Sequence, residues 1–108
     1  MKAWIFLIVA IIFEVAGTTS MKLSEGFSRL VPSIMLFVFY AASFVGVTLA
    51  LKEIDVSVAY AIWSGLGTAL ITLIGIFFFR EAVTVLKIVS IILIIIGIVG
   101  LNLAGARE

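Results

Sequence analysis

The chain has 108 residues, of which 65% are hydrophobic and only 12% are charged, and its mean hydropathy is +1.44. A soluble domain carries roughly 25% charged residues, so this chain lacks the polar surface that water requires, and we expect a bilayer around it. It contains no cysteine and no histidine, which excludes disulfides and the usual zinc ligands, and its net charge of +1 gives no case for nucleic-acid binding.

Four apolar stretches are long enough to cross a bilayer, whose core of about 30 Å requires roughly 20 helical residues. They cover approximately residues 3–21, 31–51, 56–79 and 82–104. The polar segments between them are short, which predicts antiparallel neighbouring helices. We therefore expect an all-α integral membrane protein, with residues 1–108 in a single four-helix domain. Glu14 interrupts the first stretch and argues against a signal peptide, so we expect a multi-pass protein of the plasma or inner membrane.

The first span contains one charge, Glu14, well inside its apolar run. An ionised carboxylate at that depth is costly and usually faces a partner or a water-filled path. Because no other span offers a basic partner at matching depth, we predict a proton- or cation-binding site. A protonated glutamate that links neighbouring helices is the structural alternative. The same helical face carries residues that permit close packing or a cavity beside the carboxylate, namely Leu7, Ala10, Gly17, Thr18 and Met21.

The second and third spans contribute aromatic residues at depth. Tyr40 lies mid-span with Ser43 one turn away, while Tyr60 and Trp63 share a face with Gly67. Trp63 lies roughly 10 Å into its span, deeper than interfacial aromatics prefer. Buried indole and phenol groups need hydrogen-bond partners, for which a carboxylate is suited, and rings around a carboxylate also suit an organic cation. Ordinary core packing remains the alternative.

Small residues in the third and fourth spans predict contacts or bends. Gly65 and Gly67 can kink the third helix or let two backbones touch. Ser90, Gly97 and Gly100 recur at helical spacing and predict a helix-association surface. That surface would serve either a dimer contact or packing within one protomer.

Positive charges are divided almost evenly between the two sides of the membrane. With four spans, Lys2, Lys52 and Arg107 share one side, and the other carries Lys22, Arg29, Arg80 and Lys87. This balance gives almost no orientation preference, so either another feature sets the orientation or copies insert both ways and pair antiparallel. Four packed helices leave no pathway for a solute. A transporter of this size must therefore assemble, and two copies would place two Glu14 carboxylates at one site.

The chain resembles the small multidrug resistance transporters over essentially its whole length. The most specific part is the block from Tyr60 to Gly67. The other matching pieces are Glu14-Val15, Gly17-Thr18-Thr19, Met21-Lys22, Ser24-Glu25-Gly26-Phe27, Pro32-Ser33 and Asn102.

The resemblance implies an antiparallel, dual-topology homodimer, held largely through the fourth helix, in which Glu14 binds protons and cationic substrate in competition. It implies that the substrate site is lined by Tyr60, Trp63, Tyr40, Ser43, Gly17 and Thr18. The guanidinium-exporting branch of the family places a tryptophan close after the glutamate. Here that stretch is Ala16-Gly17-Thr18, which resembles the multidrug branch. Ser90 departs from a glycine often found in the fourth helix, which puts the tightness of that contact in doubt.

These observations predict a proton-coupled antiporter that exports lipophilic and quaternary ammonium cations. Its expected partners are a second copy of the chain, protons, membrane lipid and cationic aromatic or quaternary ammonium compounds. No cofactor beyond the proton gradient and no metal are expected. An enzyme is not expected, because the spans offer no second acid and no nucleophile–base pair. The alternatives are a guanidinium/proton exporter of the same family and a non-transporting membrane subunit in which Glu14 is structural.

Overall fold

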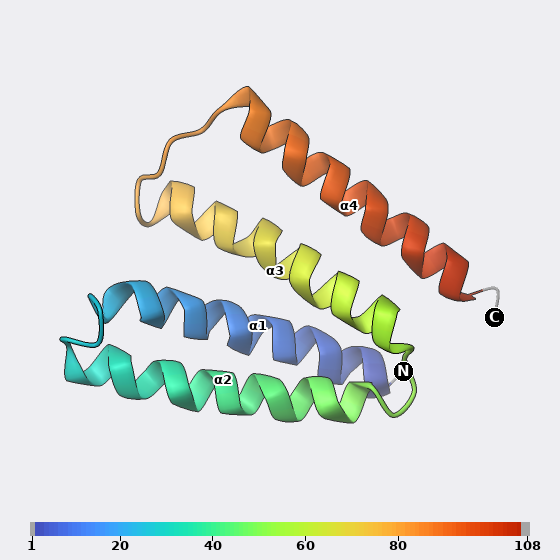
Figure 1. Cartoon of the computed structure of the whole chain (residues 1–108), viewed down its shortest axis with the longest axis horizontal. Coiled ribbons are helices and arrows are strands. Elements are labelled where there is room, and N and C mark those ends of the chain that lie inside the picture. The colour runs from blue at the N-terminus through green and yellow to red at the C-terminus, as the bar shows by residue number, and fades with distance from the viewer. Residues whose placement is uncertain (1, 107–108) are drawn as a thin grey trace. The chain divides into compact units, whose positions relative to one another are not determined.

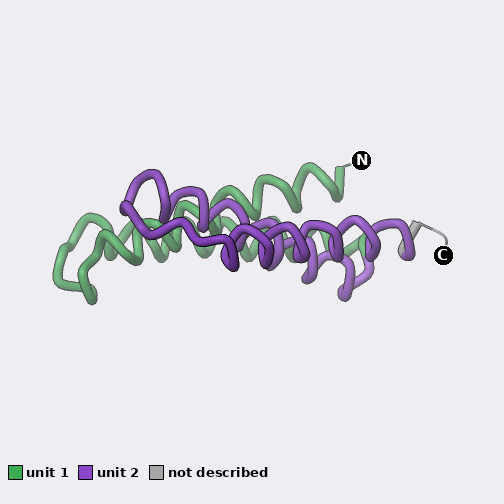
Figure 2. The backbone as a smooth tube through the Cα atoms, turned by 90° about the horizontal axis from the view of Figure 1, so that it is seen from above, with its two compact units in different colours: residues 1–54 green, residues 55–108 purple. Residues whose placement is uncertain are grey.

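The computed structural model describes residues 2–106, and all regular elements within them are α-helices. Figure 1 shows them in chain order: α1 (Lys2–Leu23), α2 (Leu30–Ala50), α3 (Val56–Phe77) and α4 (Val85–Ala106). The chain divides into two compact units, Met1–Ile54 and Asp55–Glu108 (Figure 2). Each unit therefore contains one pair of consecutive helices.

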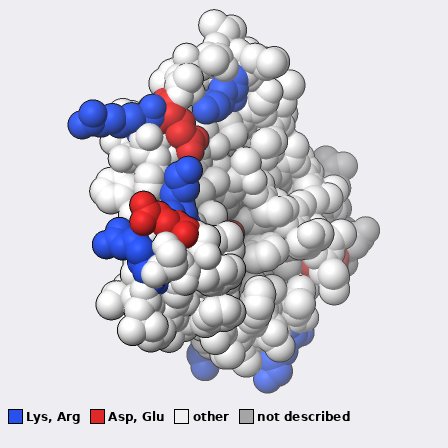
Figure 3. All heavy atoms as spheres, turned by 60° about the vertical axis from the view of Figure 1, so that its left-hand side comes forward, with Lys and Arg blue, Asp and Glu red and all other residues white. Residues whose placement is uncertain are grey.

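All four helices are long and apolar enough to cross a membrane. They contain 22, 21, 22 and 22 residues. At 1.5 Å per residue these lengths correspond to about 32–33 Å, close to the thickness of a bilayer core. Figure 3 shows charged side chains gathered in small clusters beside a broad uncharged surface. The prediction of four membrane-spanning helices is confirmed.

The largest difference from the predicted boundaries lies between α3 and α4. α3 ends at Phe77 and α4 begins at Val85, whereas the sequence predicts an end at residue 79 and a start at residue 82. The backbone N–H of Lys87 donates to Thr84 Oγ1 over 3.0 Å, so Thr84 satisfies a free N–H at the start of α4. Arg80 has a φ of 58°, a left-handed conformation that interrupts helical geometry between the two helices.

In the first unit, α1 and α2 pack against each other as antiparallel neighbours (Figure 1). They approach closely at Gly46, where an added methyl group would lie 2.9 Å from Ala10 Cβ and 3.1 Å from the Phe6 carbonyl oxygen. Small residues let apolar helices associate in lipid, because close backbone contact replaces the hydrophobic driving force that water would supply. The contact at Gly46 thereby brings the C-terminal part of α2 against the N-terminal half of α1.

The turn between α1 and α2 reverses the chain within residues 24–29. Ser24 Oγ donates to the Met21 carbonyl over 2.7 Å and accepts the Phe27 N–H over 3.2 Å. Gly26 has a φ of 72°, which glycine adopts without strain, and Glu25 and Phe27 have φ values of 49° and 69°. Each of these two non-glycine residues costs roughly 1–2 kcal/mol in that conformation. This tight reversal makes the two helices antiparallel.

In the second unit, α3 contacts α4 along a narrow strip. A methyl group added at Gly65 would lie 3.0 Å from Ile94 Cγ2 and 2.5 Å from Ile98 Cδ1, so α4 side chains occupy the space that glycine leaves. Beside this contact runs an open groove of about 380 Å³. No residue of the apolar stretch Val85–Ala104 of α4 is buried within the described part of the chain. α4 is therefore only partly covered by α3, and its other faces are open to lipid or to another chain.

Candidate functional site

Glu14 lies near the middle of α1 and is half-buried. Counted from Lys2, its backbone is about 18 Å along a helix of about 33 Å. Its carboxylate Oε1 accepts a hydrogen bond from Thr18 Oγ1 over 2.9 Å. The sequence places Thr18 on the same helical face, one turn further on, which is the spacing that permits this contact. The intramembrane carboxylate therefore has a hydroxyl partner on its own helix.

The hydrogen-bond chain continues from α1 to α2. Thr18 Oγ1 lies 2.7 Å from the Tyr40 hydroxyl oxygen. A threonine hydroxyl has one hydrogen, so when it donates to an ionised Glu14 it must accept the Tyr40 hydrogen. When Glu14 is protonated, its own hydrogen can point to Thr18 and the order of donors can reverse. The chain Glu14–Thr18–Tyr40 can thus adapt to either protonation state without moving a backbone.

Gly17 makes room for the Tyr40 ring. A methyl group added at Gly17 would lie 2.9 Å from both Tyr40 Cδ1 and Cε1. Such a distance is shorter than real contacts allow, so a larger residue would displace the ring from Thr18. Gly17 is therefore used for close packing of an aromatic side chain next to the carboxylate.

Ser43 and Ala10 meet about one helical turn from the hydrogen-bond chain Glu14–Thr18–Tyr40. Ser43 Oγ donates to the Ala10 carbonyl oxygen over 2.8 Å, and both residues are buried. The Ser43 hydroxyl hydrogen is used in this bond, so Ser43 holds α2 against α1. Leu7 is also buried on α1. Leu7, Ala10 and Ser43 are thus buried where α1 and α2 pack together. In the same unit the structure brings together Glu14, Gly17, Thr18 and Tyr40.

Gly46 is a contact that sequence reasoning missed. It packs on Ala10 beside the Ser43 bond and is needed for the close crossing of α1 and α2. The available signal was a run of small residues four apart on α2: Ala42, Gly46 and Ala50.

The second unit carries the other predicted aromatic residues. The Tyr60 and Trp63 rings are stacked, with centroids 5.9 Å apart and an angle of 27° between their planes. The Trp63 indole N–H is shielded from solvent and has no hydrogen-bond acceptor among the described residues. Tyr60 is 64% exposed. The unit therefore offers a ring pair and one unused donor.

The small residues of α3 and α4 divide into packed and open positions. α3 runs through Gly65 and Gly67 as one continuous helix, and Gly65 packs against α4. On α4, Gly97 and Gly100 have no neighbouring atoms within 4 Å of an added methyl group, and Ser90 is exposed. The kink at Gly65 and Gly67 and the dimer contact at Ser90, Gly97 and Gly100 stay predictions. Within residues 2–106, no three acidic, histidine or cysteine side chains gather at a metal-binding position.

Comparison with known proteins shows the family to which the chain belongs. The family model described as "Small Multidrug Resistance protein" matches residues 2–94. The uncharacterized membrane protein YvaE of Bacillus subtilis is 61% identical over 100 residues, covering 93% of this chain and 84% of YvaE. The multidrug resistance protein Mmr of Mycobacterium leprae is 45% identical, covering 97% of this chain and 99% of Mmr. The quaternary ammonium compound-resistance protein QacE of Escherichia coli is 44% identical, covering 95% and 94%. The chain is a multi-pass membrane protein that belongs to the small multidrug resistance family.

Proposed function

We propose that this protein is a proton-coupled antiporter that exports lipophilic and quaternary ammonium cations as an antiparallel, dual-topology homodimer. The observation that carries the proposal is the chain Glu14–Thr18–Tyr40, which places an adaptable hydroxyl pair on a half-buried intramembrane carboxylate. Two of the relatives, QacE and QacC, are named for resistance to quaternary ammonium compounds.

Exclusive occupancy of Glu14 is sufficient to couple the two fluxes. The deprotonated carboxylate attracts a cation, and a proton that binds to the same carboxylate removes that attraction. Thr18 and Tyr40 stabilise the ionised form through hydrogen bonds and lose little when the carboxyl group is protonated, because the donor order can reverse. A cation bound from the cytoplasm is then released when protons arrive from outside.

Aromatic side chains supply the affinity for organic cations. Tyr40 is linked to Glu14 by the hydroxyl group of Thr18, and the Tyr60–Trp63 pair offers a second aromatic surface. A desolvated cation over such rings gains about 2 kcal/mol, and this attraction requires no hydrogen-bond donor on the ligand. Quaternary ammonium groups have no N–H, so they are recognised by rings and a carboxylate. Guanidinium is planar and a strong donor, and it would instead need fixed acceptors.

Three observations support assembly of two copies. The apolar stretch of α4 has no buried residue, Gly97 and Gly100 are open to a close helix approach, and the positive charges are divided almost evenly between the membrane sides. In the proposed dimer the two Glu14 carboxylates share one site. Alternating access then exchanges the open side of that shared site.

The direct test is tetraphenylphosphonium binding to the purified protein from mildly acidic to mildly alkaline pH, with guanidinium as competitor. Because protons and the cation compete for Glu14, the affinity rises with pH, and guanidinium competes poorly. Strong guanidinium binding without tetraphenylphosphonium binding would assign the protein to guanidinium export instead. Absence of binding by either cation would contradict transport.

The structural alternative has one specific observation in its favour. The chain Glu14–Thr18–Tyr40 also joins α1 to α2, so Glu14 could serve only to hold the helices together. Glutamine keeps an acceptor for Thr18 but carries no charge. If Glu14→Gln retains pH-dependent cation binding, Glu14 is structural and the proposed exchange at this carboxylate is wrong.

A further inference from the structure

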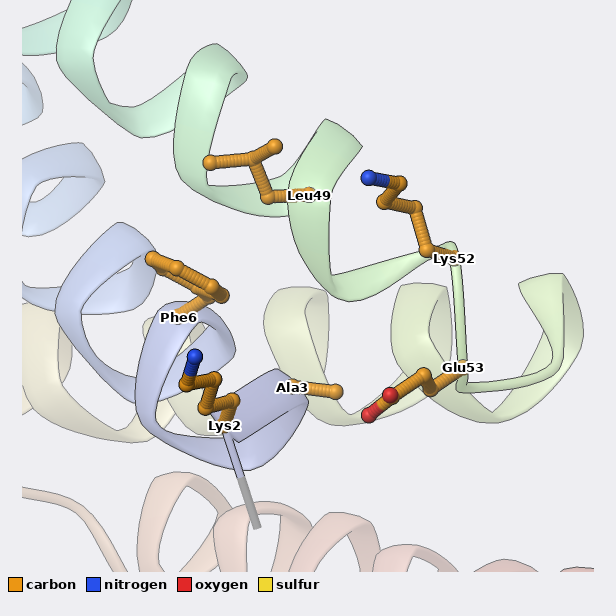
Figure 4. Close-up of a pocket in the computed structure, with 6 residues that line it drawn as sticks. All are labelled: Lys2, Ala3, Phe6, Leu49, Lys52 and Glu53. Atoms are coloured by element: carbon orange, nitrogen blue, oxygen red, sulfur yellow. The ribbon is translucent and has the colours of Figure 1, made fainter.

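A second pocket lies at the end of the first unit that is far from the turn between α1 and α2. It has a volume of about 420 Å³ and is formed by the first turn of α1, the last turn of α2 and the segment after α2. Figure 4 shows its lining side chains: Lys2, Ala3, Phe6, Leu49, Lys52 and Glu53. All of them belong to one unit, and Glu14 is not among them.

The segment after α2 is held in place by its own backbone. The N–H of Lys52 donates to the Leu49 carbonyl over 3.3 Å, and that of Glu53 donates to the Ala50 carbonyl over 3.2 Å. These turns fix Lys52 and Glu53 at the end of α2. The pocket is therefore formed by ordered backbone at the ends of two membrane helices, which is where lipid headgroups lie.

The lining combines charge with apolar surface. Figure 4 shows the ammonium groups of Lys2 and Lys52 coming from different helix ends, with Phe6 and Leu49 to one side of the space between them. Glu53 is on the other side, with its carboxylate directed toward Ala3. Two positive groups and one negative group leave a net charge of +1. This sign repels the cations that Glu14 attracts, so the pocket suits a different ligand.

We propose that this pocket binds an anionic phospholipid that carries one negative charge and a hydroxylated headgroup, as phosphatidylglycerol does. The phosphate lies between the ammonium groups of Lys2 and Lys52, and an acyl chain lies along Phe6 and Leu49. The headgroup hydroxyls donate to the Glu53 carboxylate, which would repel a headgroup of higher negative charge. Basic pockets at membrane helices recognise lipid phosphates in this manner. The proposal does not depend on the transport function.

The test is native mass spectrometry of the intact protein, titrated with phosphatidylglycerol and with phosphatidylcholine of the same acyl chains. Phosphatidylglycerol is expected to remain bound in preference to phosphatidylcholine. Lys2→Gln and Lys52→Gln are each expected to weaken its binding roughly fivefold, because one lysine near an anionic lipid raises the affinity by roughly that factor. The double variant is expected to weaken binding roughly thirtyfold, since the two effects multiply. Glycerol phosphate, a free source of the same phosphate chemistry, does not displace the lipid, because it lacks acyl chains.

The matched control removes two positive charges from the same unit outside the pocket, by Lys22→Gln with Arg29→Gln. This variant is expected to keep wild-type phosphatidylglycerol affinity. Equal losses in the control and in the pocket variant would show general charge attraction and overturn the proposal, as would displacement by glycerol phosphate. Helical circular dichroism and a single gel-filtration peak establish that each variant is folded.

The role of Glu53 has its own measurement. Phosphatidylmethanol has the same charge as phosphatidylglycerol but no headgroup hydroxyl, so the wild type is expected to bind it more weakly. Glu53→Gln is expected to raise the affinity for both lipids, because it removes a negative charge, and to reduce the difference between them. Equal binding of the two lipids by the wild type would contradict headgroup recognition by Glu53.

Discussion

The two helix pairs differ in whether hydroxyl groups join one helix to the other. In the first unit, two hydroxyl groups of α2 reach α1: Tyr40 meets Thr18, and Ser43 donates to the Ala10 carbonyl. Thr19 and Thr48 of this unit bond to carbonyls of their own helices. In the second unit, the hydroxyl groups of α3 bond to carbonyls of their own helix, as in Ser64 to Tyr60 and Thr68 to Ser64. The first pair is thus joined internally around Glu14. The second leaves α4 and its glycines open, which is what a helix needs if its main contacts are with another chain.

The largest effect is expected at the carboxylate of the first pair. Glu14→Gln should abolish transport driven by a pH gradient, because the side chain can no longer exchange a proton for a cation. Uptake of tetraphenylphosphonium into proteoliposomes under an imposed pH gradient measures this. Glu25→Gln removes a carboxylate from the exposed turn and is the matched control, for which activity should be unchanged. If Glu14→Gln still transports the cation under a pH gradient, the first helix pair does not contain the proton-exchanging group.

The next effect tests the tight crossing of α1 and α2. Gly46→Ala adds a methyl group where Ala10 Cβ and the Phe6 carbonyl are already close, so it should destabilise the protein by about 1–3 kcal/mol. Reversible unfolding in mixed detergent micelles gives the free energy. Gly26→Ala is not a suitable control, because its φ is positive. Gly97→Ala places the same methyl group in open space and should not destabilise the protomer. Equal losses of unfolding free energy in Gly46→Ala and Gly97→Ala would mean that the first helix pair is not more closely packed than the second.

The open face of the second pair is tested by larger side chains. Gly97→Leu and Gly100→Leu should leave each protomer folded, since nothing lies within 4 Å of either position. They should weaken dimerisation by about 1–3 kcal/mol if this surface packs against a second copy, because overpacking a close contact carries that cost. Energy transfer between labelled protomers in liposomes measures the dissociation constant. An unchanged constant would place the dimer contact elsewhere.

The smallest effect concerns one hydroxyl group. Tyr40→Phe keeps the ring against Gly17 but removes the hydrogen bond to Thr18, whose net worth is about 0.5–1.5 kcal/mol. Tetraphenylphosphonium affinity at alkaline pH should fall by no more than roughly tenfold, since Thr18 still donates to Glu14. Isothermal titration measures this change. Thr18→Val removes both bonds at once and should cost more; a smaller loss than for Tyr40→Phe would show that the chain of hydroxyls does not act on Glu14.

Much of the site was visible in the sequence because its main feature is chemical. A single carboxylate in an apolar run marks Glu14 without any knowledge of the fold. Thr18 follows from helical spacing alone. Tyr40 was recognisable as a mid-span aromatic residue, but its pairing with Thr18 was not, since that contact depends on how α2 is rotated. Gly46 and the lysine-lined pocket were missed for the same reason.

The sequence by itself determined that four helices cross the membrane and where the one intramembrane acid lies. Length and hydropathy are properties of each segment alone, and lipid accepts an apolar helix in any rotation. For that reason helices that are apolar on every side do not reveal which faces meet. Only the tertiary structure decided that Gly17 accommodates the Tyr40 ring, that Ser43 bonds to the Ala10 carbonyl, and that Lys2 and Lys52 border one pocket. In lipid, such contacts are selected by close packing and by hydrogen bonds between particular atoms, which exist only once the helices have been brought together.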